Sequence, residues 1–200
     1  MLYLAYYIVL WHKYSTFWDL WAVLFYFFNV FIYIMGLSKN CKAIQNRKKA
    51  NDVFITPKEL SKMHIDLIDY EPSDLWLDPC KNNGSYYDQF PNDNKDWCEI
   101  LDDKDFFDYT GSPDIIIQNP PFSLINKWID KNIELKPRVI SFLIGLMNLT
   151  MKRVATLEKA GYGLTKFHIV SVYKWFGSSV LVVFEKDKKS IITYNRKTFR

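Results

Sequence analysis

Two consecutive prolines follow an apolar run near the middle of the chain, and they restrict the fold on both sides of them. Residues 114–118 read Asp-Ile-Ile-Ile-Gln, a pattern typical of a short strand buried on both faces. Proline has no backbone N–H and a fixed φ, so Pro120 and Pro121 cannot continue a central strand. The sequence therefore predicts that the chain leaves a sheet at Asn119 in an extended turn. In open α/β sheets, ligands bind at this carboxyl end of the strands.

The remaining pattern predicts an α/β fold in which strands and helices alternate. Strands are expected at residues 74–78, 96–100, 115–118 and 138–146. Helices are expected at residues 57–68, 124–133 and 149–160. Thr56 is the predicted cap of the first helix, with Pro57 at its first position. This alternation implies a mostly parallel sheet.

Two further segments complete the predicted fold. The β-rich runs 167–175 and 179–185 flank Phe176-Gly177-Ser178, so they predict a C-terminal antiparallel hairpin. Residues 104–107 are compatible with a strand or a single turn. The stretch from Glu99 to Asp114 is too short for a full helix and another strand.

The first 37 residues differ in composition from the rest. Residues 17–37 are nearly all apolar and long enough to span a bilayer, and the basic run 39–49 would keep the downstream part on the cytoplasmic side. Two alternatives stay open: a start of synthesis at Met35, and a buried pair of helices. We expect residues 38–200 to form one α/β domain inside the cell, with membrane contact only through residues 17–37.

Charge and cysteine content narrow the classes of function. The net charge is +4, but residues 88–114 carry nine acids and two lysines, whereas residues 151–200 carry eleven basic residues and three acids. An acidic middle with basic flanks fits a cationic small ligand at the centre and a polyanion outside it. The three cysteines, Cys41, Cys80 and Cys98, and the scattered histidines lack the spacing of a zinc site, so we expect no metal and a reducing compartment.

The turn at Asn119 carries side chains suited to a planar ligand. The carbonyl groups of Asn119 and the backbone beside it can accept hydrogen bonds from an amino group, and the ring of Phe122 can stack on a flat heterocycle. Together these groups suit the positioning of an amino group on a planar base next to a reactive donor.

Three motifs, in a particular order along the chain, carry a resemblance to a known family. Thr56-Pro57 comes first, Leu77-Asp78-Pro79-Cys80 with Gly84 follows, and Asn119-Pro120-Pro121-Phe122 comes last. In this order, residues 53–186 resemble the amino-group DNA methyltransferases that use S-adenosylmethionine, the N6-adenine type especially. The resemblance implies a Rossmann-like methyltransferase fold and nucleic acid, DNA above all, as partner.

The resemblance also implies a role for each motif residue. In the cofactor site, the loop from Asp78 through Pro79 and Cys80 to Gly84 would approach the methionine portion of S-adenosylmethionine. Thr56 would bind its carboxylate and Glu99 its ribose hydroxyls. Asp105 would accept from the adenine amino group while Phe106 packs on the ring, although the same pair is compatible with a helix cap and core aromatics. At the target, Asn119 and Pro120 would accept from the amino group, Pro121 would shape the turn, Phe122 would stack on the base, and Phe176 would line the far wall.

Two departures from the family pattern leave other functions open. Asn82 stands where the family has the first glycine of the cofactor loop, and Asn is the residue other than Gly that best tolerates a positive φ. No separate target-recognition region follows the hairpin; about 14 mostly polar and basic residues remain. The alternatives are a non-catalytic relative that binds nucleic acid, and a methyltransferase acting on RNA or on a protein glutamine amide.

Overall fold

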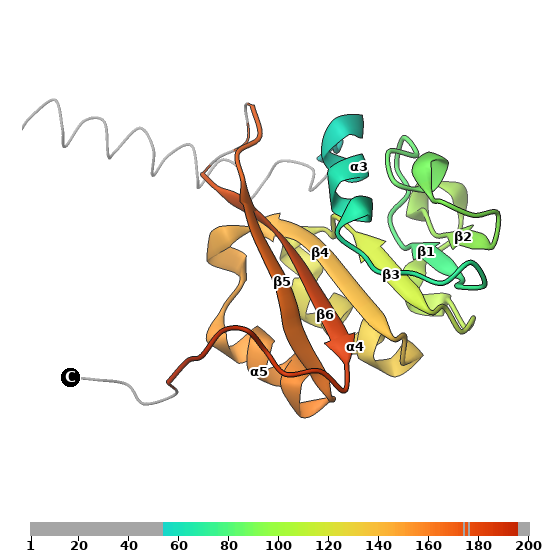
Figure 1. Cartoon of the computed structure of the whole chain (residues 1–200). Helices are drawn as coiled ribbons and strands as arrows, with labels where there is room; N and C mark the ends of the chain where they lie inside the picture. Colours follow the sequence, from blue (N-terminus) through green and yellow to red (C-terminus); the bar gives the residue numbers. More distant parts are fainter. Residues whose placement is uncertain (1–53, 174, 176, 196–200) are drawn as a thin grey trace, which may run out of the picture. The chain divides into compact units, whose positions relative to one another are not determined.

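The sheet of this protein has six strands in the order β2-β1-β3-β4-β6-β5 (Figure 1). The structure, a computed structural model, describes residues 54–195 except 174 and 176, so the predicted segment 1–37 lies outside the described residues. The strands are β1 Trp76–Asp78, β2 Lys95–Trp97, β3 Ile115–Gln118, β4 Val139–Gly145, β5 Tyr162–Val170 and β6 Ser179–Lys186. The pairs among β1, β2, β3 and β4 are parallel, whereas β6 is antiparallel to both β4 and β5. The predicted mostly parallel sheet with an antiparallel hairpin is confirmed.

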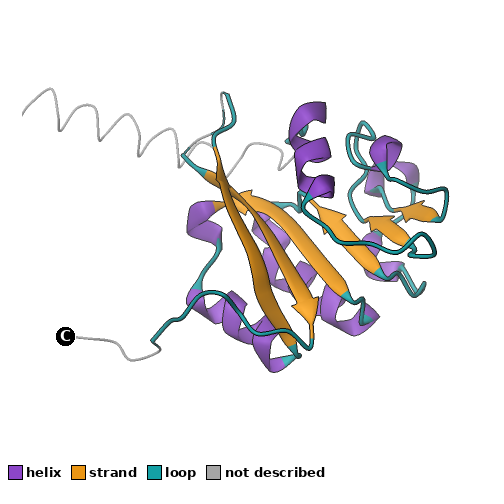
Figure 2. Cartoon of the chain, in the orientation of Figure 1, coloured by secondary structure: helices purple, strands orange, loops and turns teal. Residues whose placement is uncertain are grey.

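Helices cover both faces of this sheet (Figure 2). The α-helices are α3 Lys58–Asp66, α4 Ile125–Leu135 and α5 Met151–Lys159. One face packs against α4 and α5 through side chains such as Ile116, Ile129 and Leu157, and the other packs beneath α3 through Ile65, Ile115 and Ile117. Successive β3 residues therefore face opposite layers, as in a strand buried on both sides. None of the helices in the described part of the chain is long and apolar enough to cross a bilayer.

Short 3₁₀ helices replace regular structure at the carboxyl edge of the sheet. They are η1 Tyr87–Gln89, η2 Ile100–Asp102, η3 Phe106–Asp108, η4 Phe122–Leu124 and η5 Leu146–Asn148. Only η2 and η3 lie between β2 and β3, which confirms that this stretch holds no additional strand or α-helix. In the segment 104–107, predicted as strand or turn, Lys104 forms an isolated antiparallel bridge with Glu99, and Phe106 and Phe107 belong to η3.

The predicted position of the first hairpin strand was wrong by about five residues. β5 begins at Tyr162 and ends at Val170, so Trp175, the predicted end of this strand, lies in the connection to β6. Gly163 explains the error, because a glycine inside a strand resembles a turn signal in sequence. A Cβ atom at Gly163 would lie 2.2 Å from the carbonyl oxygen of Lys188, so the close approach of the C-terminal segment requires a glycine there.

A buried histidine links α3 to the sheet. The Nδ1 atom of His64 lies 2.8 Å from the hydroxyl of Tyr86, and its Nε2 atom lies 2.7 Å from the hydroxyl of Ser141. Ser141 donates to the carbonyl oxygen of Val182, so Ser141 accepts from Nε2–H and Tyr86 donates to Nδ1. A neutral imidazole satisfies every group of this network, and burial lowers the pKa of His64 from 6.5 to about 3.

Acid is therefore expected to destabilise the fold through His64. The unfolded chain takes up a proton near pH 6.5 and the folded chain only near pH 3. The contribution of His64 is thus complete above pH 6.5 and falls by about 1.4 kcal/mol per pH unit below it. Asp78, whose pKa burial raises to about 7, acts in the opposite sense, so the wild type alone does not isolate the effect.

Urea unfolding of the wild type and His64→Gln between pH 4 and 6.5 isolates the histidine. The stability advantage of the wild type is expected to shrink by about 1.4 kcal/mol per unit as the pH falls. Ser141→Ala removes a hydrogen bond but keeps the titrating ring, so it serves as the matched control and is expected to keep the pH slope of the wild type. Parallel curves for the wild type and His64→Gln would show that His64 is not held neutral by the fold.

Candidate active site

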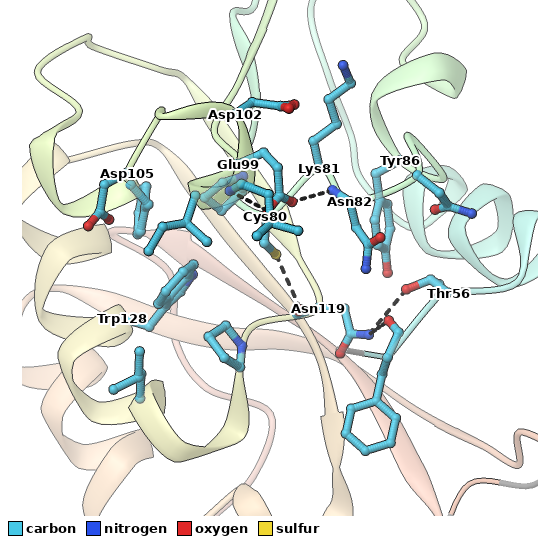
Figure 3. A pocket seen from close by; sticks show the side chains of 18 of the residues that line it. Thr56, Cys80, Lys81, Asn82, Tyr86, Glu99, Asp102, Asp105, Asn119 and Trp128 are labelled. Carbon is cyan, nitrogen blue, oxygen red and sulfur yellow. Dashed lines mark hydrogen bonds between the residues drawn. The ribbon is translucent and has the colours of Figure 1, made fainter. Parts of the chain in front are cut away.

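One cavity of about 580 Å³ lies among the loops that follow β1, β2 and β3 (Figure 3). β1 lies between β2 and β3 in the sheet. The chain therefore continues toward β2 after β1, and in the opposite direction along the sheet, toward β4, after β3. Such a switch point is the usual ligand site of an open α/β sheet. The volume lies within the range that encloses a small-molecule cofactor.

The cavity brings together most of the predicted site residues. Those that line it are Thr56, Pro79, Cys80, Glu99, Asp105, Phe106, Asn119 and Pro121. Asp78, Gly84, Pro120 and Phe122 lie next to lining residues in the sequence but do not line the cavity themselves. The predicted cofactor and target residues thus share one edge of one sheet. Phe176 lies outside the described residues.

The loop after β1 is shaped by a buried carboxylate. Asp78 is fully buried, and its Oδ1 atom accepts from the backbone N–H of Cys80 at 3.2 Å. Its Oδ2 atom has no hydrogen-bond partner among the described residues, and burial raises the pKa of Asp78 to about 7. Gly84 closes the loop with φ of +79°, and a Cβ atom there would meet the Asp88 carboxylate at 2.8 Å. Gly84 therefore meets a backbone requirement, whereas the exposed side chain of Asp88 could turn aside for a Cβ atom.

Glu99 connects this loop to the segment after β2. Its carboxylate accepts from the backbone N–H of Asn82 at 2.7 Å and from that of Leu101 at 3.2 Å (Figure 3). Asn82 has φ of +48°, the left-handed conformation that a glycine would adopt without strain. The departure from the family pattern is thus accommodated by Asn82 itself and by its hydrogen bond to Glu99.

Three aromatic side chains, Phe106, Phe107 and Trp128, form an aromatic wall of the cavity. Phe106 is buried, with its ring centroid 4.9 Å from that of Trp128, and Phe107 meets Trp128 edge-on at 5.3 Å. Asp105 accepts from the backbone N–H of Phe107 at 2.9 Å and so caps η3. The helix-cap alternative for Asp105 is what the structure shows, and the residue also lines the cavity.

Thr56 does not cap α3, contrary to the prediction. Pro57 occupies the cap position, and no side chain caps the helix. The hydroxyl oxygen of Thr56 instead accepts from the amide Nδ2 of Asn119 at 3.2 Å, and its carbonyl oxygen accepts from Ser85 at 2.7 Å. Tertiary contacts between the cavity loops thus replace the local cap.

The turn after β3 presents an amide with one unpaired acceptor. The Nδ2 atom of Asn119 donates to Thr56 and to the carbonyl oxygen of Phe54, at 3.2 and 3.1 Å (Figure 3). The thiol of Cys80 donates to the backbone carbonyl of Asn119 at 3.2 Å. The Oδ1 atom of Asn119 is buried, and no described group donates to it. These contacts fix the orientation of the amide and leave its buried acceptor without a hydrogen-bond donor.

Sequence reasoning missed part of the cavity wall, including several apolar side chains. Phe54, Ile100, Leu101 and Trp128 line the cavity, and Ile100 and Leu101 are strongly exposed. Ile100 and Leu101 directly follow the predicted Glu99, so their place in the sequence beside a predicted site residue was the available signal. Phe54 and Trp128 reach the site only through tertiary contacts.

Comparison with known proteins identifies the fold but no family. No family model matches the sequence, and no curated protein matches it. Solved structures do match: a precorrin-6y C5,15-methyltransferase from Geobacter metallireducens GS-15 (17% identity, covering 66% of this chain and 90% of that chain, TM-score 0.51), the Mtq2–Trm112 complex of E. cuniculi (17%, 68% and 99%, 0.50) and the 23S rRNA methyltransferase ErmE (11%, 71% and 73%, 0.52). The chain has a methyltransferase fold.

Within this methyltransferase fold, the position of the cavity follows from the topology. The loops after β1 and β3 diverge at the switch point, and Cys80 and Asn119 join them by the thiol hydrogen bond. Identities of 11–17% support the shared fold alone, so the chemistry of the site has to be argued from its own residues.

Proposed function

We propose that this protein transfers a methyl group from S-adenosylmethionine to the exocyclic amino group of adenine in DNA. The observation that carries the proposal is the unpaired Oδ1 atom of Asn119, beside the cavity at the end of β3. Leaving a buried acceptor unpaired costs about 1–3 kcal/mol, so such a group in a native site calls for a functional reason. An amino group of the substrate would supply the missing donor.

The residues around the cavity fit the proposed cofactor. Glu99 would accept from the ribose hydroxyls, and the aromatic wall of Phe106 and Trp128 would pack beside the adenine ring, where Asp105 also lies. The loop of Asn82 and its neighbours would face the methionine portion. S-adenosylmethionine would supply an electrophilic methyl group at a sulfonium centre, and the acidic side chains of Glu99, Asp102 and Asp105, which line the cavity, favour a cationic ligand.

At the target, this chain would position the nucleophile. Asn119 Oδ1 and the carbonyl oxygen of Pro120 would each accept one N–H of the amino group, which directs the nitrogen lone pair toward the methyl group. The nitrogen would gain the methyl group and release one proton to solvent, with S-adenosylhomocysteine as the other product. Proximity and alignment would account for most of the rate, so no strong base is needed. A base in a duplex would have to flip out to reach Asn119.

The charge distribution bears on how nucleic acid would be held. Residues 54–195 contain 17 basic and 20 acidic residues, so the net positive charge of the chain comes from residues 1–53 and 196–200. Phosphate contacts would therefore depend on those flanking basic residues and on Lys186, Lys188 and Lys189 near the end of β6. Binding of this kind is sequence-independent and weakens steeply with salt.

Two measurements test the proposal. Calorimetry is expected to show micromolar binding of S-adenosylmethionine, whereas millimolar or absent binding would favour the non-catalytic alternative. Incubation with a tritiated methyl donor and DNA, RNA or protein, followed by nucleoside and amino-acid analysis, is expected to place the label on N6-methyladenine in DNA. Label in RNA or on glutamine would reassign the substrate; the matching structures include a 23S rRNA methyltransferase and a complex that methylates a translation termination factor.

A further inference from the structure

The ring of Phe122, on which the target base would stack, is already covered by another ring. Phe54 stacks on Phe122 with centroids 5.6 Å apart and planes 23° apart. Trp175, in the connection from β5 to β6, meets the Phe54 ring edge-on at 5.5 Å and 66°. Phe54 lines the cavity and Phe122 does not. A flat ring of the protein itself thus lies against Phe122, with a second aromatic ring at its edge.

This spacing leaves no room for a base between the two phenylalanines. Two successive ring contacts of about 3.5 Å each would hold the outer rings about 7 Å apart. The centroids of Phe54 and Phe122 are only 5.6 Å apart, so the two rings are in direct contact. A base can stack on this face of Phe122 only if Phe54 moves away.

The same segment lies against the proposed catalytic amide. The carbonyl oxygen of Phe54 accepts from Nδ2 of Asn119 at 3.1 Å. The Oδ1 atom of Asn119 is buried although Asn119 lines the cavity. The acceptor that a target base would use is therefore buried, and the stacking face of Phe122 is covered by Phe54.

We propose that Phe54 is a gate that occupies the target-base position in the free protein and must leave Phe122 before a base can bind. This inference deepens the proposed function, because it concerns access to the same Asn119 site. The apparent affinity for a base would equal the intrinsic affinity multiplied by the fraction of molecules in which the gate is open.

The hydrogen bonds around the gate indicate which part moves. Thr56 is buried and bonded to both Asn119 and Ser85, which fixes the backbone at the start of α3. The carbonyl oxygen of Phe54 is bonded to Nδ2 of Asn119, which holds the backbone at Phe54 as well. The opening movement is therefore a rotation of the Phe54 side chain, with the backbone anchored at Thr56.

Binding of a fluorescent base, 2-aminopurine riboside, tests the gate without requiring methyl transfer. The titration is carried out with the full chain and with S-adenosylhomocysteine present, in the wild type, Phe54→Ala, Phe54→Leu, Phe54→Tyr and the double variant Phe54→Ala/Phe122→Ala. Loss of the two ring contacts of Phe54 is expected to tighten binding of the probe about tenfold in Phe54→Ala and in Phe54→Leu. Phe54→Tyr keeps the ring and is expected to bind like the wild type.

The outcomes separate the gate from other roles of Phe54. The gain in Phe54→Ala has to disappear in the double variant, because the probe would stack on Phe122. Weaker binding in Phe54→Ala would make Phe54 a permanent wall of the site and overturn the proposal, as would unchanged binding. Failure of S-adenosylhomocysteine to bind counts against the proposed function. The gate is still decided by the comparison of Phe54→Ala with the double variant that also lacks the ring of Phe122.

Discussion

Asn119→Ala is expected to remove nearly all methyl transfer while leaving binding of S-adenosylmethionine nearly unchanged. The variant removes the unpaired acceptor Oδ1, which the proposed mechanism uses to orient the amino group. Removing one preorganised polar group at a reacting centre typically lowers kcat by about 100- to 1,000-fold. Single-turnover transfer of a tritiated methyl group and calorimetry on the same preparation measure the two quantities.

Folding of the Asn119→Ala variant has to be checked, because Asn119 also donates to Phe54 and Thr56. Loss of these two hydrogen bonds is expected to cost about 1 kcal/mol each in unfolding free energy. Asn126→Ala is the matched control, because Asn126 lies exposed on α4 and does not line the cavity, and it is expected to retain full activity. Loss of cofactor affinity in a folded Asn119→Ala protein would mean that the target pocket is misplaced.

The strands and helices of the fold were predictable because their local sequence patterns agree with their tertiary packing. The Ile115–Ile117 run forms a strand buried on both faces, and Pro120 ends it as proline chemistry requires. The parallel order follows from strands that alternate with helices, which leaves few other arrangements. Consistency between local preference and global packing makes such segments readable from sequence.

The errors fall where distant contacts override local preference. Thr56 has the sequence of a helix cap, but its oxygen bonds to Asn119, 63 positions away. Gly163 reads as a break in the strand, but it lies inside β5 because the C-terminal segment passes over it. Phe54 gives no sequence signal at all, since its position depends on Phe122 and Trp175. The motifs thus predicted which loops form the cavity, and the contacts between those loops were beyond sequence reasoning.

Glu99→Ala is expected to weaken binding of S-adenosylmethionine by roughly 10- to 150-fold, the equivalent of losing 1.5–3 kcal/mol from hydrogen bonds to a charged group. Two causes combine in this loss. The carboxylate would bind the ribose hydroxyls, and it already holds the backbone N–H groups of Asn82 and Leu101. Calorimetry measures the effect, and Asp93→Ala, which removes an exposed acid that does not line the cavity, is the matched control for charge.

A second substitution separates the two causes. Asn82 holds φ of +48° against its steric preference, and the hydrogen bond to Glu99 offsets part of that cost. In Asn82→Gly the loop keeps this conformation without strain, so adding this change to Glu99→Ala restores only the affinity lost through the loop. Because the ribose contact cannot be restored in this way, we expect the double variant to recover less than half of the lost binding free energy. Full recovery would show that Glu99 acts on the loop alone, and the assignment of Glu99 to the ribose would be wrong.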